Sequence, residues 1–312
     1  MNIEWLYVSH KEIRKLKKNG FTTVESLAFT PDYFLVEALG LSYREVSKFK
    51  EKLLKKIDVN VLSAYEHFLK KRSQVKYITT GCGCLDGLLG GGVETGAVTE
   101  FVGEFGTGKT QLAHQLAVTV QLPEDKGGLE AKAVYIDTEG TFRPERIIQI
   151  AQHQGLNPLH TLENILYTRT YTTEQQIFTI KLLEKLLEEI NIGLVVVDSI
   201  IAHFRAEYSG SEVFIRQRLL ARHLKDLNLL AEKYNIAVVI TNHVLAVPGV
   251  FVGNPLKPVG GNVLAHGCTH RVWLRKIDEK RWAARLFDSP LNPEAEVVYA
   301  ISKEGVLDYR SR

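Results

Sequence analysis

Cysteine is scarce in this chain, which has three among its 312 residues: Cys82, Cys84 and Cys268. So few cysteines cannot build a disulfide framework, and their scarcity favours an intracellular protein. Cys82 and Cys84 have a Cys-x-Cys spacing, but no Cys/His pair at ligand spacing accompanies them. We therefore expect two small buried residues here rather than a metal site.

Long apolar runs are also missing. No stretch approaches the roughly 20 apolar residues that a membrane-spanning helix needs, and we see no signal peptide and expect no membrane partner. The composition, 45% hydrophobic and 24% charged, is that of a globular protein, and the length allows one large and one small domain. Methionine occurs once, whereas Lys, Glu, Ile and Leu abound, which suits a thermophile.

Charge is unevenly distributed, although the net charge is only +3. Residues 1–76 contain 15 Lys/Arg and 9 Asp/Glu, a difference of +6, whereas the rest contains 24 and 27, a difference of −3. A basic module on a near-neutral core favours a nucleic-acid partner. A solvated helical surface explains the same charges equally well, so both readings stay open.

Residues 1–58 predict a small, all-helical N-terminal domain. Ser9–Glu12 resembles a capping box, Thr22–Glu25 is typical of a helix start, and Ala38–Ser42 predicts a tight turn into a helix over Tyr43–Lys56. The turn resembles a helix-hairpin-helix, whose backbone N–H groups contact DNA phosphates. Serine stands where the second glycine is usual, so protein docking or a structural role is comparably open.

Residues 59–76 predict a linker with a helical segment at Tyr65–Arg72, and residues 77–312 predict an α/β core. The core alternates strands and helices, which is typical of a mostly parallel central sheet. The expected strands are Val98–Val102, Ala133–Asp137, Gly193–Asp198, Ala237–Thr241, Arg271–Arg275, Ala283–Phe287 and Val297–Ile301. The expected helices include Glu174–Ile190 and Gln217–Tyr234.

A complete phosphate-binding motif, G-x-x-x-x-G-K-[ST], lies at the start of this core. Its residues are Gly103, Glu104, Phe105, Gly106, Thr107, Gly108, Lys109 and Thr110. It follows a predicted strand and opens a predicted helix that continues from Gln111, which is the context the motif needs. Backbone N–H groups would surround phosphate oxygens, Lys109 would add positive charge, and Thr110 would offer its hydroxyl to Mg²⁺. The motif predicts nucleoside triphosphate binding.

Three further strands end in polar residues at the edge where ligands bind in open α/β sheets. Asp198 ends an apolar strand, a Walker B pattern, and should hold Mg²⁺ directly or through water. Glu139 is the best-placed group to orient or deprotonate an attacking water, although a surface carboxylate is the alternative. His243 could sense the γ-phosphate, and a purely structural histidine is equally open.

Two segments, Glu207–Ile215 and Leu245–Gly261, are predicted to be loops. The second has three prolines, four glycines and little periodicity. Such long stretches without secondary structure usually carry a function or are disordered. Both follow strands of the phosphate edge, so nucleotide state could control the binding of a polymer there.

Together these residues resemble the RecA/RadA recombinase family, in its archaeal RadA and eukaryotic recombinase branch, nearly end to end. The matching segments are Phe21–Ser26, Gly90–Gly96, Gly103–Gln111, Val120–Pro123, Tyr135–Arg146, Phe204–Tyr208 and Asp288–Pro290. The resemblance implies a RecA-like P-loop ATPase core and a DNA-dependent ATPase that uses ATP and Mg²⁺. It implies filaments on single-stranded DNA that pair and exchange homologous strands in DNA repair. Double-stranded DNA, further copies of the chain in a filament or ring, and recombination mediators are the implied partners.

The resemblance also implies roles for individual residues. Lys109 and Glu139 would be catalytic, Gly103–Gln111 would bind the nucleotide, and Arg146 would stack on adenine. Asp288, Ser289 and Pro290 would form a cap that the neighbouring subunit closes over ATP. The DNA-binding residues, in or beside the two loops, would be Arg205, Arg216, Val247, Gly260, Gly261 and Asn262. The polymerisation motif would include Val61 and Ala64.

Three departures from the family pattern fall on assembly, DNA contact and γ-phosphate sensing. Val61 stands where a Phe begins the polymerisation motif, and the smaller side chain loses on the order of 1–3 kcal/mol of burial. Ser209–Ser211 lacks the usual Gly-Arg of the first DNA loop, and His243 replaces the usual Gln.

Two functions therefore remain: a working recombinase, or an accessory protein that binds ATP and DNA or a partner and modulates filaments without exchanging strands. We favour the first because Glu139, Asp198, the cap and a full second loop are present. A ring-forming helicase is disfavoured by the N-terminal module and the cap. The second loop is complete but short, and together with the sparse Met and Cys it favours an archaeal cytoplasm or nucleoid over a eukaryotic nucleus.

Overall fold

The computed structural model describes residues 14, 16, 17, 21, 23–55, 61–246 and 256–309. The chain forms two compact units, Met1–Lys70 and Lys71–Arg312. Within the described part, no helix is both long and apolar enough to cross a membrane.

The N-terminal unit is helical where it is described, as predicted. Its helices include α2 (Val24–Phe29), α3 (Asp32–Leu39) and α4 (Tyr43–Leu54). Thr23 caps α2 and Ser42 caps α4, each as one half of a capping box. The serine at the expected glycine position therefore starts a helix. Ser9–Glu12 lies outside the described residues.

Helix α5 (Ala64–Gln74) spans the boundary between the units and confirms the predicted helical segment. None of its side chains is buried within the described structure. Val61, just before it, is 86% exposed.

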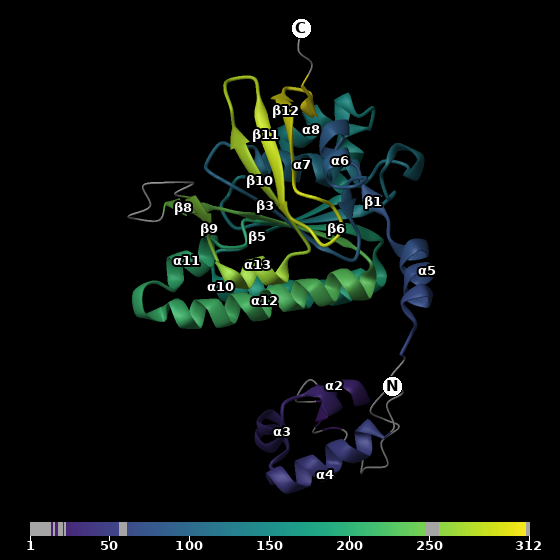
Figure 1. Ribbon diagram of the computed structural model, residues 1–312, viewed down its shortest axis with the longest axis vertical. Coiled ribbons are helices and arrows are strands. Elements are labelled where there is room, and N and C mark those ends of the chain that lie inside the picture. The colour runs from purple at the N-terminus through teal and green to yellow at the C-terminus, as the bar shows by residue number, and fades with distance from the viewer. Residues whose placement is uncertain are drawn as a thin grey trace. The chain divides into compact units, whose positions relative to one another are not determined.

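The second unit is built on a nine-stranded sheet, whose strands β3, β5, β6, β10, β11 and β12 are labelled in Figure 1. Its order is β13-β12-β11-β10-β3-β7-β6-β4-β5. The strands are β3 (Val98–Gly103), β4 (Lys132–Asp137), β5 (Ile165–Arg169), β6 (Ile192–Asp198), β7 (Ala237–Asn242), β10 (His270–Lys276), β11 (Trp282–Asp288), β12 (Ala295–Ser302) and β13 (Gly305–Asp308). Strands β10 to β5 pair in parallel, and β10 to β13 pair antiparallel. The predicted α/β class with a mostly parallel central sheet is confirmed.

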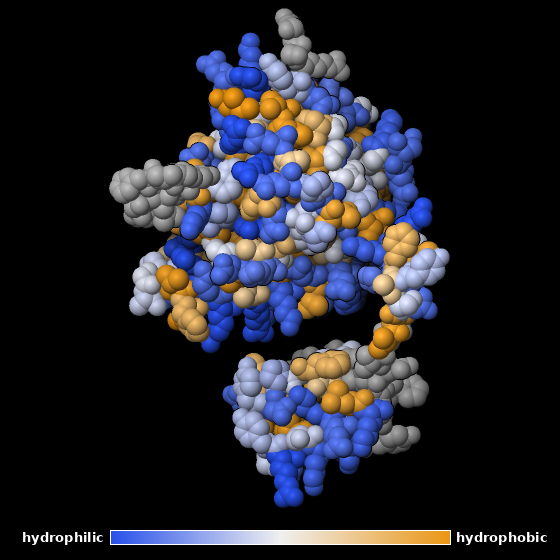
Figure 2. Space-filling model, viewed as in Figure 1, coloured by the Kyte–Doolittle hydropathy of each residue, from blue (hydrophilic) through white to orange (hydrophobic). Residues whose placement is uncertain are grey.

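Helices cover both faces of the sheet (Figure 1). Helices α6 (Gly83–Leu88), α7 (Lys109–Thr119) and α8 (Pro144–His153) pack on one face, where Tyr135 and Val196 point. Helices α10 (Thr173–Glu189), α11 (Ala202–Glu207), α12 (Val213–Tyr234) and α13 (Asn262–Gly267) lie on the other. Because β6 is buried on both faces, its run of valines is apolar throughout. The exposed side of α12 is largely hydrophilic (Figure 2).

Shorter elements complete the described core. They are β1 (Tyr77–Ile78), β2 (Val93–Glu94), β8 (Val244–Ala246), β9 (Leu256–Pro258), α9 (Pro158–Glu163) and 3-10 turns at Glu124–Lys126 and Gly210–Glu212.

Both predicted loops contain more regular structure than expected. Residues 213–215 of the first already belong to α12, which was predicted to begin at Gln217. Val213, Phe214 and Ile215 are exposed, so this first turn lacks the buried stripe from which a helix is recognised in sequence. The second loop starts and ends as the antiparallel hairpin β8–β9, and residues 247–255 lie outside the described part.

Candidate nucleotide-binding site

The phosphate-binding motif forms the turn between β3 and α7. Gly108, the residue just before α7, has φ 96°, and this backbone conformation favours glycine. Gly103 is required for a different reason, because a Cβ there would lie 2.3 Å from the Leu274 carbonyl oxygen on the neighbouring strand β10. Close packing of β3 against β10 thus requires glycine at position 103, and the backbone conformation favours glycine at position 108.

Lys109 begins α7 and points back over the turn. Its Nζ donates to the carbonyl oxygens of Gly103 (2.9 Å) and Glu104 (2.7 Å), and the side chain is 7% exposed. Burial lowers the pKa of Lys109, while the carboxylates of Asp198 and Glu139 act in the opposite direction. The ammonium group is thus held where the motif predicts β- and γ-phosphates.

Asp198 ends β6 at the same sheet edge, directly opposite Asp137 of β4. Its Oδ2 accepts a hydrogen bond from Tyr135 Oη at 2.8 Å, and its Oδ1 accepts one from Thr241 Oγ1. Burial and the nearby carboxylate raise the pKa of Tyr135, so the phenol keeps its proton and remains a donor. Two donors from neighbouring strands therefore fix an aspartate oriented for a hard cation such as Mg²⁺.

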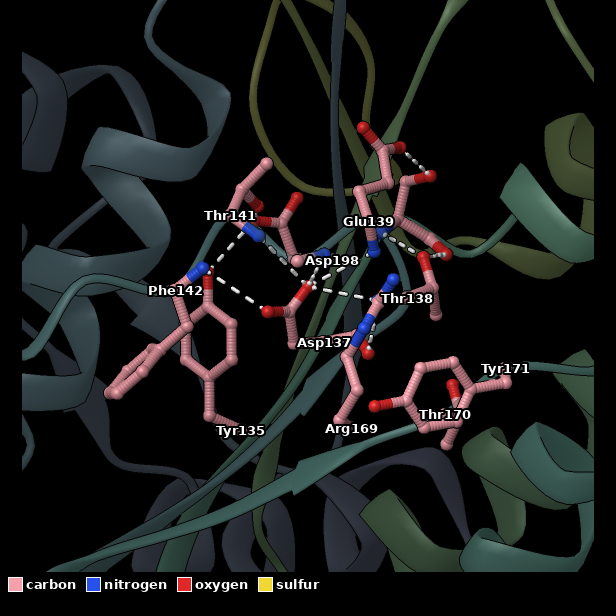
Figure 3. Close-up of polar contacts among 12 residues, drawn as sticks. Tyr135, Asp137, Thr138, Glu139, Thr141, Phe142, Arg169, Thr170, Tyr171 and Asp198 are labelled. Carbon is pink, nitrogen blue, oxygen red and sulfur yellow. Dashed lines mark hydrogen bonds and ion pairs between the residues drawn. The ribbon is translucent and has the colours of Figure 1, made fainter.

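Asp137 shapes the loop that carries Glu139 (Figure 3). Its Oδ1 accepts from the backbone N–H groups of Glu139 (3.0 Å), Gly140 (2.7 Å) and Thr141 (3.2 Å), and its Oδ2 accepts from that of Phe142 (3.1 Å). Arg169 Nη1 donates to the backbone oxygen of Asp137 at 2.9 Å. One buried carboxylate thus satisfies four consecutive N–H groups and sets the position of Glu139.

Glu139 lies between two polar side chains. Its Oε1 accepts from Ser199 Oγ at 2.5 Å and from His243 Nε2 at 2.5 Å. Burial raises the pKa of this carboxyl, but the bonds from His243 and Ser199 and the charge of Lys109 outweigh it and lower the pKa. Glu139 is therefore ionised at neutral pH, which is the form that a general base needs.

These groups line one cleft of about 590 Å³. Its lining includes residues 105–111, Glu139, Thr141, Arg146, Asp198, His243, Trp282, Ile301 and Ser302. The Arg146 guanidinium donates to the carbonyl oxygens of Ser302 (2.7 Å) and Lys303 (2.6 Å) and to Gln111 Oε1 (2.7 Å). These bonds hold its planar group at the cleft wall, where an adenine could stack.

The predicted cap residues do not line this cleft of their own chain. Asp288 is the last residue of β11, and Ser289 Oγ accepts from the backbone N–H groups of Leu291 and Asn292, forming a turn. A role toward a neighbouring chain's nucleotide stays a prediction.

A buried network joins the cap strand to the cleft edge; we call it the interior network, and it consists of Arg271, Glu100 and Asn242. Arg271 Nε donates to Glu100 Oε2 at 2.5 Å, and Asn242 Nδ2 donates to Glu100 Oε1 at 2.7 Å. Arg271 also lies 4.0 Å from Asp288 Oδ2. Asn242 accepts from His243 N and donates to the Val259 carbonyl, beside strand β9.

The residues predicted to bind DNA fall on three elements. Arg205 lies on α11, Arg216 lies in the first turns of α12, and Asn262 starts α13 after Gly260 and Gly261. Arg216 Nη1 donates to the Tyr208 carbonyl at 3.4 Å, so this arginine flanks the first predicted loop, Glu207–Ile215. Val247 lies outside the described residues.

Sequence reasoning missed several residues that position the site. Tyr135, Asp137, Ser199 and Thr241 hold the two candidate carboxylates, yet no role was predicted for any of them. A signal existed for Asp137, because it directly follows a buried strand at the phosphate edge. Ser199 and Thr241 have no such signal, since only the fold shows which side chains face Glu139 and Asp198.

Comparisons with known proteins agree with this geometry. The sequence model of the Rad51 family matches residues 71–309, the whole described core. The chain is 46% identical over 296 residues to the DNA repair and recombination protein RadA of Aeropyrum pernix, which covers 95% of this chain and 92% of the relative. This chain therefore belongs to the Rad51 family of RecA-like recombinases.

Proposed function

We propose that this protein is an ATP-dependent DNA recombinase that assembles on single-stranded DNA and exchanges homologous strands in DNA repair. The observation that carries the proposal is the cleft in which Lys109, Asp198 and Glu139 converge. The named activity of the relative, DNA repair and recombination, supports it. With DNA as its substrate, the protein would act in the part of the cell that contains the DNA.

The residues of the cleft divide the chemistry among them. Lys109 would stabilise negative charge on the β- and γ-phosphates, and Glu139 would orient and deprotonate the attacking water. Ser199 and His243 hold Glu139 by its Oε1, leaving Oε2 for the water. Thr110 and Asp198 fit Mg²⁺ because both offer oxygen ligands, and the ion would neutralise phosphate charge.

The proposal is tested by strand exchange with and without ATP and Mg²⁺. We expect exchange that needs both, and we expect Lys109→Ala to lose nucleotide binding and exchange together, because it removes the charge that faces the phosphates. Lys280→Ala, which removes an exposed lysine on the β10–β11 turn, is the matched control and should behave as the wild type. Nucleotide binding is followed with a fluorescent ATP analogue.

An accessory role is the second candidate, because Val61 in place of Phe weakens the expected contact between subunits. Electron microscopy with ATP and single-stranded DNA distinguishes the two. Long helical filaments support the recombinase, whereas isolated particles support the accessory protein. No strand exchange at any protein concentration, despite normal ATP binding, would rule out the proposed activity.

A further inference from the structure

Cys82, Cys84 and Asp308 form a side-chain cluster outside the nucleotide cleft. One ligand atom from each lies within 4.8 Å of the others. Cys82 Sγ lies 3.4 Å from Cys84 Sγ and 3.4 Å from Asp308 Oδ1. The expectation of two small buried cysteines holds for Cys82 but fails for Cys84, which is half-buried. No local sequence pattern indicates the third member, Asp308, which lies 224 residues beyond Cys84.

The spacing of these atoms suits a tetrahedral metal ion. With metal–sulfur bonds of about 2.3 Å and a metal–oxygen bond of about 2.0 Å, two sulfur ligands lie about 3.8 Å apart and sulfur and oxygen about 3.5 Å apart. The Cys82 Sγ–Cys84 Sγ and Cys82 Sγ–Asp308 Oδ1 separations, both 3.4 Å, are close to these values. Thiolate ligands select soft or borderline ions such as Zn²⁺ over Mg²⁺ and Ca²⁺.

The carboxylate of the cluster is already oriented by backbone groups. Asp308 Oδ1 accepts from Cys84 N at 2.8 Å, and Oδ2 accepts from Gly83 N at 3.1 Å. Such outer contacts fix a ligand before the ion arrives. Asp308 is exposed whereas Cys82 is fully buried, so the cluster extends from the core to the solvent-accessible surface.

We propose that Cys82, Cys84 and Asp308 bind one thiophilic divalent ion of the Zn²⁺ class, with water as a fourth ligand. The ion joins the start of α6 to the end of β13, so its role is structural. Both segments adjoin Gln115 of the P-loop helix α7, whose Nε2 donates to the carbonyl oxygens of Thr80 and Val306. The ion would therefore stabilise the two segments that hold Gln115, and through Gln115 the position of helix α7.

Proton release gives the site a characteristic pH dependence. A cysteine binds a metal ion as its thiolate, whereas a free thiol is mostly protonated at neutral pH, so the ion must displace a proton from each sulfur. Affinity therefore increases with pH. A site made of carboxylates alone, already ionised at neutral pH, would not show this increase.

The test is Zn²⁺ binding to the full chain, measured by competition with a chromophoric chelator in a phosphine reductant and excess Mg²⁺. We expect one tight Zn²⁺ per chain, and affinity at least about tenfold weaker in Cys84→Ser and in Asp308→Asn, as for loss of a ligand or its partner. Cys268→Ser, which removes the remaining cysteine, is the matched control and should bind as the wild type. Co²⁺ should give thiolate charge-transfer absorption whose intensity falls in Cys84→Ser, because one of the two thiolates is lost.

A second readout is thermal unfolding. At a given Zn²⁺ concentration, the rise in the unfolding midpoint should be as large in Cys268→Ser as in the wild type and smaller in Cys84→Ser. Equal Zn²⁺ affinity in wild type and Cys84→Ser overturns the proposal. Absence of Zn²⁺ binding, together with a diamide-induced loss of two thiols per chain that Cys84→Ser prevents, also overturns it and identifies a disulfide-forming pair.

Discussion

Glu139 receives both of its side-chain hydrogen bonds on the same oxygen, from Ser199 and His243. The histidine follows β7 and the serine follows β6, so the ends of two neighbouring strands together lower the pKa of the Glu139 carboxyl. His243 is also one of the three departures from the family pattern. This departure therefore acts directly on the candidate base.

Replacing His243 by Ala should raise the pKa of Glu139, because it removes a bond that lowers this pKa. A base acts only when ionised, so the acidic limb of the pH profile of ATP hydrolysis should move to higher pH. The measurement is kcat/KM for ATP as a function of pH. His243→Gln, which keeps a donor but cannot become charged, should shift the limb less. An unchanged limb in His243→Ala would contradict the assignment of Glu139 as the base.

At the scale of elements, the packing of α10 against α12 buries an uncharged histidine. His223 of α12 is fully buried, and its Nε2 lies 3.2 Å from Gln176 Nε2 of α10. Its Nδ1 has no hydrogen-bond partner among the described residues. The glutamine donates, so the histidine must accept through Nε2 and carry its proton on Nδ1. A proton on both nitrogens would place an unpaired charge between the helices.

Acid should therefore destabilise the core through His223. Burial lowers the pKa of His223 from 6.5 to about 4 in the folded protein, so the unfolded chain binds the proton first as the pH falls. The free energy of unfolding should drop by about 3 kcal/mol from this residue between about pH 6.5 and pH 4. In His223→Gln this drop should be missing, while His153→Gln, at an exposed histidine, should retain it. Urea unfolding at several pH values measures the difference, and equal drops in both variants would refute the explanation.

The strands and helices that sequence reasoning found are those with continuous apolar runs or strong periodicity. Strand β6 and helix α10 were predicted to within two residues at each end. Strand β5 was missed because it lies at the sheet edge, and Tyr167 and Arg169 break the apolar pattern. The hairpin β8–β9 was missed because its strands are only three residues long.

The residues of the candidate site also fall into those that could be predicted from the sequence and those that could not. Lys109, Asp198 and Glu139 were found because a local motif or a strand end marks each of them. The residues that hold these three side chains in place were not predicted, because only the order of the strands in the sheet brings them together. Cys84 and Asp308 are the clearest case, since no local pattern links residues so far apart in the sequence.

At the scale of the whole molecule, the segment before the core offers apolar side chains to solvent. Val61 is 86% exposed, and Tyr65 and Phe68 of α5 are 69% and 54% exposed. Such exposed apolar side chains on a charged chain are typical of a contact with a partner, here proposed to be a second copy.

Val61→Phe should strengthen self-association, because the larger side chain buries more apolar area in the proposed contact. The gain should be on the order of 1–3 kcal/mol, or about 5-fold to 150-fold in the association constant. Sedimentation velocity and filament length in electron microscopy measure it. Leu159→Phe, at another exposed position, controls for added hydrophobicity alone. Assembly unchanged by Val61→Phe would show that the segment is not a limiting contact.

The interior network links the chain's own nucleotide cleft to the residue proposed to cover a neighbouring chain's nucleotide. Glu100 has no exposed surface, and it joins Asn242, next to the chain's own cleft, to Arg271, next to Asp288. If Asp288 covers the ATP of a neighbouring chain, as proposed, then a change at that ATP displaces a buried ion pair whose other end adjoins His243 and strand β9. Hydrolysis would then be cooperative along the polymer. The release of DNA would depend on the state of two adjacent nucleotides and not on that of a single one.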